Sequence, residues 1–171
     1  MERNWKELYE QGKIVNGLEG FQGDFEFLSN FCRHDSVLSL ALPYGKKNAH
    51  QVISDNIEIL FQAAKVDSWH DLAFIIQCKT PGQAKRNGRR IKLREDWEEN
   101  KDKIMEDLVR QKFTRLPIFR QKLLSIPDDM YIVEMNYWND TYWGVNKRTF
   151  EGENRLGEIL MKIRSELRSQ K

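Results

Sequence analysis

Residues 57–65 read Ile-Glu-Ile-Leu-Phe-Gln-Ala-Ala-Lys, and this spacing predicts an amphipathic helix. Apolar side chains recur at positions 57, 60, 61 and 64, which places them on one face of a helix with 3.6 residues per turn. Glu58, Gln62 and Lys65 form a neighbouring polar stripe. We therefore expect a helix whose apolar face enters a core and whose polar stripe faces one cavity.

Helical patterns continue on the C-terminal side of this stretch. Residues 69–78 predict a second helix. Thr80 and Pro81 supply an N-cap and a first helical position for a third helix, which we expect to end at Asn87-Gly88 in a left-handed C-cap. Further helices are expected to begin at Asp96, through a capping box with Glu99, just after Pro117, and after an N-cap at Asn154.

Strand signals are fewer and shorter. Phe25 and Phe27 alternate with polar residues and predict a strand that runs into a turn at Ser29-Asn30. Residues 37–42 and 130–135 are the other strand candidates, and residues 43–55 are expected to form a turn and a polar loop. The chain is thus expected to be α+β, a helix-rich single domain with a small β-sheet.

The composition excludes several classes of protein. Lys and Arg total 28 against 26 Asp and Glu, which lacks the one-sided excess of a protein that coats DNA. Cys32 and Cys78 are too few for a disulfide framework, and the motifs of zinc proteases, nucleotide-binding loops and serine hydrolases are missing. Because these motifs are missing, we expect no metal and no cofactor. With neither a membrane span nor a signal peptide in the sequence, we expect a cytoplasmic protein with no membrane partner.

Seven segments in order resemble the NADAR, or YbiA-like, family over roughly residues 21 to 168. They are residues 27–31, 58–65, 84–89, 97, 112–113, 139–144 and 154–161. The resemblance implies a YbiA-like N-glycosidase domain at residues 21–171, preceded by an N-terminal extension at residues 1–20.

The resemblance also implies an activity and a catalytic set. Bacterial members of the family resemble enzymes that cleave the bond between ribose 5-phosphate and the amino-pyrimidine of early riboflavin-biosynthesis intermediates. The family's catalytic glutamate, tryptophan and aspartate fall on Glu58, Trp97 and Asp140. One departure is Ile59, which stands where the family usually has histidine, and it implies a difference in substrate or rate.

These residue types suit the cleavage of an N-ribosyl bond. The transition state carries positive charge on C1′ and the ring oxygen, so nearby carboxylates lower the barrier. We expect Glu58 to stabilise that charge and Asp140 to position the attacking water, with the reverse assignment open. Trp97 offers an aromatic face on which a base can stack.

The substrate's phosphate needs cationic groups and amides. Lys65, Lys85, Arg89 and Arg155 are the cationic candidates, and Gly88 would allow close approach of the backbone. The complete set of candidate substrate-binding residues is Asn30, Gln62, Lys65, Lys85, Arg89, Trp143, Asn154 and Arg155.

Structural roles compete with these assignments. Glu58 lies three residues after Asp55 and would complete a capping box, and Trp97 would serve as a core residue. The basic stretch from Lys85 would form a solvated face, and Asn154 would only cap a helix.

Other functions also stay open at this stage. The resemblance implies a small phosphoribosyl or ADP-ribosyl substrate as the partner. The alternatives are removal of ADP-ribose from guanine in ADP-ribosylated nucleic acid, a non-catalytic module that binds ADP-ribose or a related nucleotide, and plain nucleic-acid binding through residues 84–94.

Overall fold

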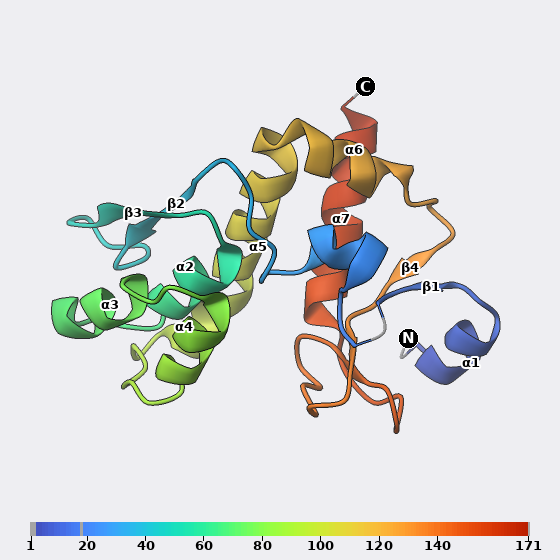
Figure 1. The fold of residues 1–171 in the computed structure, drawn as a ribbon, viewed down its shortest axis with the longest axis horizontal. Helices are drawn as coiled ribbons and strands as arrows, with labels where there is room; N and C mark the ends of the chain where they lie inside the picture. Colours follow the sequence, from blue (N-terminus) through green and yellow to red (C-terminus); the bar gives the residue numbers. More distant parts are fainter. Residues whose placement is uncertain (1–2, 18, 171) are drawn as a thin grey trace. The chain divides into compact units, whose positions relative to one another are not determined.

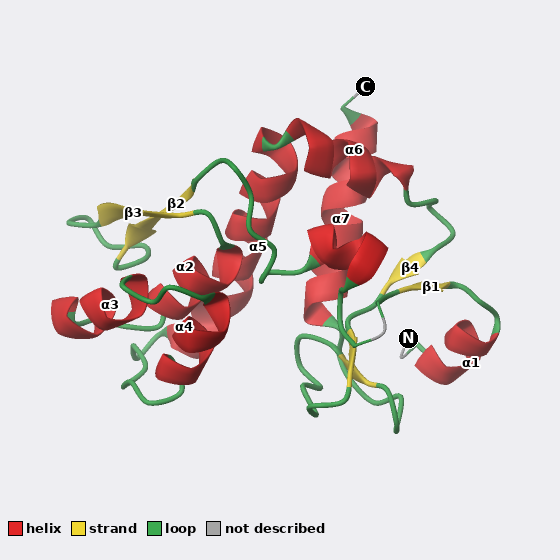
Figure 2. Ribbon diagram, in the orientation of Figure 1, coloured by secondary structure: helices red, strands yellow, loops and turns green. Residues whose placement is uncertain are grey.

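The computed structural model describes residues 3–17 and 19–170, and the chain divides into two compact units (Figure 1). We call Asn30–Lys112 the central unit, and Met1–Ser29 with Phe113–Lys171 the terminal unit. Helices and short strands occur in both units (Figure 2), so the expected helix-rich α+β fold is confirmed. The strands of the described residues form three two-stranded sheets. In this part of the chain, no helix combines the length and apolarity needed to cross a bilayer.

The central unit is built around one helix. Its elements are β2 (Leu38–Leu42), β3 (His50–Ser54), α2 (Ile57–Ala63), α3 (Trp69–Ile76), α4 (Pro81–Asn87) and most of α5 (Trp97–Arg115). Every residue of α2 is buried, and this helix packs against α3, α4 and β3 (Figure 1). The predicted helix at residue 57 is therefore confirmed, and its burial makes α2 the core element of the unit.

The terminal unit combines the two ends of the chain. Its elements are α1 (Trp5–Glu10), β1 (Ile14–Val15), the 3₁₀ helix η1 (Gly23–Leu28), α6 (Pro117–Ser125), β4 (Tyr131–Ile132), β5 (Met135–Asn136), β6 (Val145–Asn146) and α7 (Arg155–Ser169). Strand β1 pairs in parallel with β4, and β5 pairs in parallel with β6. Helix α7 packs against β4 and α6. A core cluster joins Trp5 to Val133, Met135 and Val145.

One strand prediction and one loop prediction are wrong. Residues 23–28 form η1 instead of a strand. Phe27 and Leu28, which are adjacent within η1, are both buried, whereas adjacent residues of a strand point to opposite faces. Strand β3 lies in the region expected to be a loop. It pairs with β2 along five residues, from Leu38 opposite Ser54 to Leu42 opposite His50.

One predicted helix end also differs. Helix α4 ends at Asn87 as expected, but Gly88 has φ of −61° and is right-handed. Backbone conformation therefore does not explain glycine at this position.

Candidate active site

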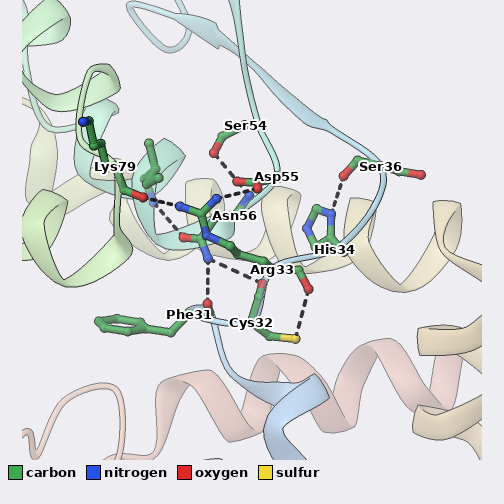
Figure 3. A network of polar contacts seen from close by, with 10 residues as sticks. Phe31, Cys32, Arg33, His34, Ser36, Ser54, Asp55, Asn56 and Lys79 are labelled. Carbon is green, nitrogen blue, oxygen red and sulfur yellow. Dashed lines mark hydrogen bonds and ion pairs between the residues drawn. The ribbon is translucent and has the colours of Figure 1, made fainter.

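The N-terminus of α2 is fixed by Asn56, which is fully buried (Figure 3). Its Oδ1 accepts a hydrogen bond from the Ile59 N–H at 3.2 Å, so Asn56 is the N-cap. Its Nδ2 donates to the carbonyl oxygens of Phe31, at 2.8 Å, and Cys32, at 3.4 Å. One side chain thus caps the helix and ties to it the segment between η1 and β2.

The alternative role of Glu58, in a capping box with Asp55, is wrong, because Asn56 is the N-cap. Asp55 instead accepts a hydrogen bond from Arg33 Nη1 at 2.9 Å, and Arg33 also donates to the carbonyl of Lys79 (Figure 3). The Glu58 N–H donates to the carbonyl of Asn30 at 3.1 Å. Glu58 therefore lies in the first turn of α2 without serving as part of its cap.

The Glu58 carboxylate is buried and bonded to an amide on its own helix. The Glu58 residue is 5% exposed, and its Oε1 accepts a hydrogen bond from Gln62 Nε2 at 2.7 Å. Burying a carboxylate is unfavourable unless hydrogen bonds or charges compensate it. The two residues are four positions apart, so this contact realises part of the predicted polar stripe.

Lys65 extends the polar stripe into an aromatic and basic environment. Its Nζ lies 5.5 Å from the ring centroid of Trp97 and 5.7 Å from that of Phe61. Burial lowers the pKa of Lys65, the charges of Lys85 and Arg89 lower it further, and the Glu58 carboxylate opposes them. Lys65 therefore shares an electrostatic environment with three other predicted site residues.

Trp97 is 6% exposed, and its ring centroid lies 5.1 Å from that of Phe61. The backbone N–H of Trp97 donates to the carbonyl of Arg94, and the backbone N–H of Arg94 donates to the carbonyl of Lys65 at 2.8 Å. Arg94 thereby joins Lys65 and Trp97 through its backbone. Trp97 has the contacts of a core residue, and its stacking on a base stays a prediction.

The buried guanidinium of Arg94 was missed by the sequence analysis. It donates to both carboxylate oxygens of Asp96, at 2.5 and 2.8 Å, and to the carbonyl of Tyr44 at 2.8 Å. These hydrogen bonds lower the pKa of Asp96. Asp96 therefore has a partner of its own at the start of α5, where the sequence predicted a capping box with Glu99.

The other candidates of the central unit lie near the ends of α2 and α4. Asn30 Nδ2 donates to the sulfur of Met105 at 3.3 Å. Lys85 Nζ lies 5.6 Å from the ring centroid of Phe31, and Arg89 is exposed. Their contact with substrate stays a prediction.

Asp140 lies in a clasped loop of the terminal unit. The buried Asn136 accepts a hydrogen bond from the Asp140 N–H at 3.0 Å and donates to the Asp140 carbonyl at 2.8 Å. Asp140 Oδ1 accepts from the Trp143 N–H at 2.9 Å. Asn139 precedes Asp140 with a left-handed φ of +62°. Asn136 was missed, although a polar residue following an apolar strand was its signal.

Asn154 and Arg155 begin α7 in different environments. Asn154 has φ of +53°, and its fully buried side chain accepts from the Glu134 N–H at 3.1 Å and donates to the Ile132 carbonyl at 2.9 Å. Asn154 occupies the N-cap position of α7 as predicted, but its side chain makes no capping hydrogen bond, because both polar atoms bond to residues 132–134. Arg155 lines a hollow of about 630 Å³, which is also lined by Arg3, Trp5, Thr141, Glu151, Gly152, Glu153 and Glu158.

The structure groups the predicted site residues by unit. The central unit contains Asn30, Glu58, Gln62, Lys65, Lys85, Arg89 and Trp97, and the terminal unit contains Asp140, Trp143, Asn154 and Arg155. The predicted pairing of Glu58 with Asp140 stays a prediction. Among residues 3–17 and 19–170, no cluster of three or more His, Cys, Asp or Glu side chains is arranged to hold a metal ion.

Comparison with known proteins identifies the class of the chain. It is 34% identical over 116 residues to N-glycosidase YbiA of Escherichia coli strain K12, which covers 67% of this chain and 71% of the relative. The NMR structure of the E. coli protein YbiA matches with a TM-score of 0.71 and 31% identity, over 92% of this chain and 86% of that one. The protein is thus an N-glycosidase.

The family follows from the same comparisons. The NADAR domain matches residues 21–168, and the chain belongs to this family. A further relative is the chloroplastic riboflavin biosynthesis protein PYRR of Zea mays, 31% identical over 155 residues, which are 84% of this chain and 23% of the relative. Riboflavin biosynthesis protein VVA0006 of Vibrio vulnificus is 30% identical over 112 residues, which are 64% of this chain and 30% of the relative.

Proposed function

We propose that this N-glycosidase hydrolyses the N-ribosyl bond of phosphoribosylated intermediates of riboflavin biosynthesis. The products are ribose 5-phosphate and the free amino-pyrimidine. The observation that carries the proposal is the buried Glu58 carboxylate, which is held by Gln62 and lies in the electrostatic environment of Lys65. The names of the maize and Vibrio relatives support this class of substrate.

The proposed reaction needs two carboxylates. As the bond between C1′ and nitrogen breaks, its electron pair leaves with the nitrogen, and Glu58 stabilises the positive charge on the ribosyl group. Asp140 positions a water molecule, and the oxygen of this water bonds to C1′. The Asp140 carboxylate accepts a proton from the water and then donates a proton to the leaving nitrogen. The clasp formed by Asn136 supports this role, because it restrains the backbone on both sides of the Asp140 side chain.

The proposed binding groups divide between phosphate and base. We assign the phosphate to Lys65, Lys85 and Arg89, because the charges of Lys85 and Arg89 both act on the Lys65 ammonium, which indicates a concentrated positive potential there. Arg155 is a further cationic candidate. We assign the base to the aromatic side chains of Trp97 and Trp143.

The variant Glu58→Gln tests the proposal because it removes the charge and keeps the shape and a hydrogen-bond acceptor for Gln62. We expect kcat to fall by about 10³-fold, the size of a lost electrostatic contribution at a developing charge. Release of ribose 5-phosphate from the phosphoribosyl amino-pyrimidine is followed by chromatography. Glu99→Gln, at an exposed glutamate of α5, is the matched control and should leave kcat unchanged.

Two outcomes contradict the proposal. Full activity of Glu58→Gln would remove Glu58 from the reaction. If the wild-type protein binds the phosphoribosyl substrate without releasing the amino-pyrimidine, while it releases ADP-ribose from modified guanine, the substrate class is wrong.

A further inference from the structure

The Gln62 side chain occupies the space that a side chain at position 88 would need. A Cβ atom at position 88 would lie 2.0 Å from Gln62 Oε1 and 2.9 Å from Gln62 Cδ. Real Cβ atoms almost never approach another heavy atom within 3.0 Å. Since φ of Gly88 is −61°, an ordinary value for any residue, the backbone does not require glycine here. Glycine at the end of α4 is therefore explained by the space that Gln62 occupies.

The amide of Gln62 has a fixed orientation. Its Nε2 donates to the Glu58 carboxylate at 2.7 Å, so its Oε1 points away from that carboxylate. This oxygen is buried and has no hydrogen-bond partner among the described residues, and the Gln62 residue is 3% exposed. The oxygen occupies the space that a side chain at position 88 would otherwise fill. Close packing on this side thus limits the positions open to the amide.

We propose that Gly88 is a positioning residue for the reaction and sets the orientation of the Glu58 carboxylate through Gln62. This inference rests on the proposed role of Glu58. Helix α4 packs against α2, and the Gly88 N–H bonds to the Ala84 carbonyl at 2.8 Å, which anchors position 88 to its helix. The backbone of Gly88 therefore limits how far the Gln62 amide can move, and this amide donates the hydrogen bond that orients the Glu58 carboxylate.

A methyl group at position 88 has to displace this amide. Gln62 is enclosed in the buried face of α2, so the least costly movement is rotation of its side chain away from Gly88. That rotation moves Nε2 relative to the Glu58 carboxylate and weakens the hydrogen bond. Because Glu58 acts on a charge that develops only in the transition state, we expect the change in kcat rather than in KM.

The test is a double-substitution cycle with the phosphoribosyl amino-pyrimidine as substrate. We expect Gly88→Ala to lower kcat by about 30-fold and to change KM by less than about threefold. Gln62→Ala should give a loss of similar size. When both substitutions are combined, the loss should equal that of Gln62→Ala alone, because the added methyl group no longer meets the amide. Gly82→Ala is the matched control in α4, where a Cβ meets nothing within 4 Å, and it should retain the wild-type kcat.

The outcomes separate the two proposals. Unchanged kcat in Gly88→Ala, or the same fold loss from Gly88→Ala with and without Gln62, would overturn the positioning role. Full activity of Glu58→Gln in the same assay would instead overturn the proposed function. If Gly88→Ala fails to fold, its thermal unfolding in the Gln62→Ala background decides: restored folding supports the steric coupling, and continued failure refutes it.

Discussion

The ammonium group of Lys65 provides a pH-dependent test of phosphate binding. Burial lowers its pKa, and Lys85 and Arg89 act in the same direction. Lys65 therefore loses its charge at a lower pH than an ordinary lysine does. As pH rises through that lowered pKa, KM should increase about tenfold, because the phosphate loses one charged hydrogen bond. Arginine stays charged over this range, so KM of Lys65→Arg should be independent of pH there.

The measurement is KM of the phosphoribosyl substrate from pH 7 to pH 10, well above the second ionisation of a phosphate. Lys92→Arg is the control, since Lys92 is exposed in the same basic stretch, and it should reproduce the wild-type profile. An identical rise of KM in Lys65→Arg would show that another group titrates.

At the level of elements, the start of α2 depends on Asn56. Asn56→Ala removes the N-cap and leaves the carbonyl groups of Phe31 and Cys32 without this donor. We expect the free energy of unfolding to fall by about 3 kcal/mol, the sum of a lost cap and a lost buried hydrogen bond. Urea unfolding measures it. Thr80→Ala, which removes the more exposed cap of α4, should cost only about 1 kcal/mol, and equal losses would contradict the tertiary role of Asn56.

Helices were more predictable than strands for a physical reason. The apolar side chains of residues 57–64 recur with the period of a helix, so the sequence indicates α2 and its apolar face, whereas the burial of its polar residues depends on the elements packed around it. Strand β3 depends on pairing with β2, and its own residues are largely exposed, so its local pattern resembles that of a loop. The choice between Asp55 and Asn56 as cap depends on Arg33, which approaches from a distant part of the sequence.

For the molecule as a whole, the candidate site was predictable where its contacts are local. Glu58 and Gln62 meet because they are four residues apart on one helix. The backbone N–H of Arg94 bonds to the carbonyl of Lys65, 29 positions earlier, and no local sequence pattern indicates such a contact. The contact of Gln62 with Gly88 likewise joins two helices. Sequence reasoning thus missed Arg94 altogether, and it named Gln62 and Gly88 for contact with substrate rather than for contact with each other.

The N-terminal segment was expected to be an extension, and it lies outside the matched range of residues 21–168. The structure nevertheless places Trp5 in the core cluster of the terminal unit, where it is 6% exposed and its Nε1 donates to the Gly152 carbonyl at 3.0 Å. Strand β1 also pairs with β4. Removing this tryptophan should therefore create a cavity in the core.

We expect Trp5→Ala to lower the free energy of unfolding by about 4 kcal/mol, as is typical when a large aromatic residue is truncated in a core. Far-UV circular dichroism in urea measures the change without depending on the removed chromophore. Lys6→Ala, at an exposed position of the same short helix, should change the free energy by less than about 0.5 kcal/mol. A loss below about 1 kcal/mol for Trp5→Ala would mean that the segment is an appendage. The expected larger loss would make residues 3–15 part of the fold of the terminal unit.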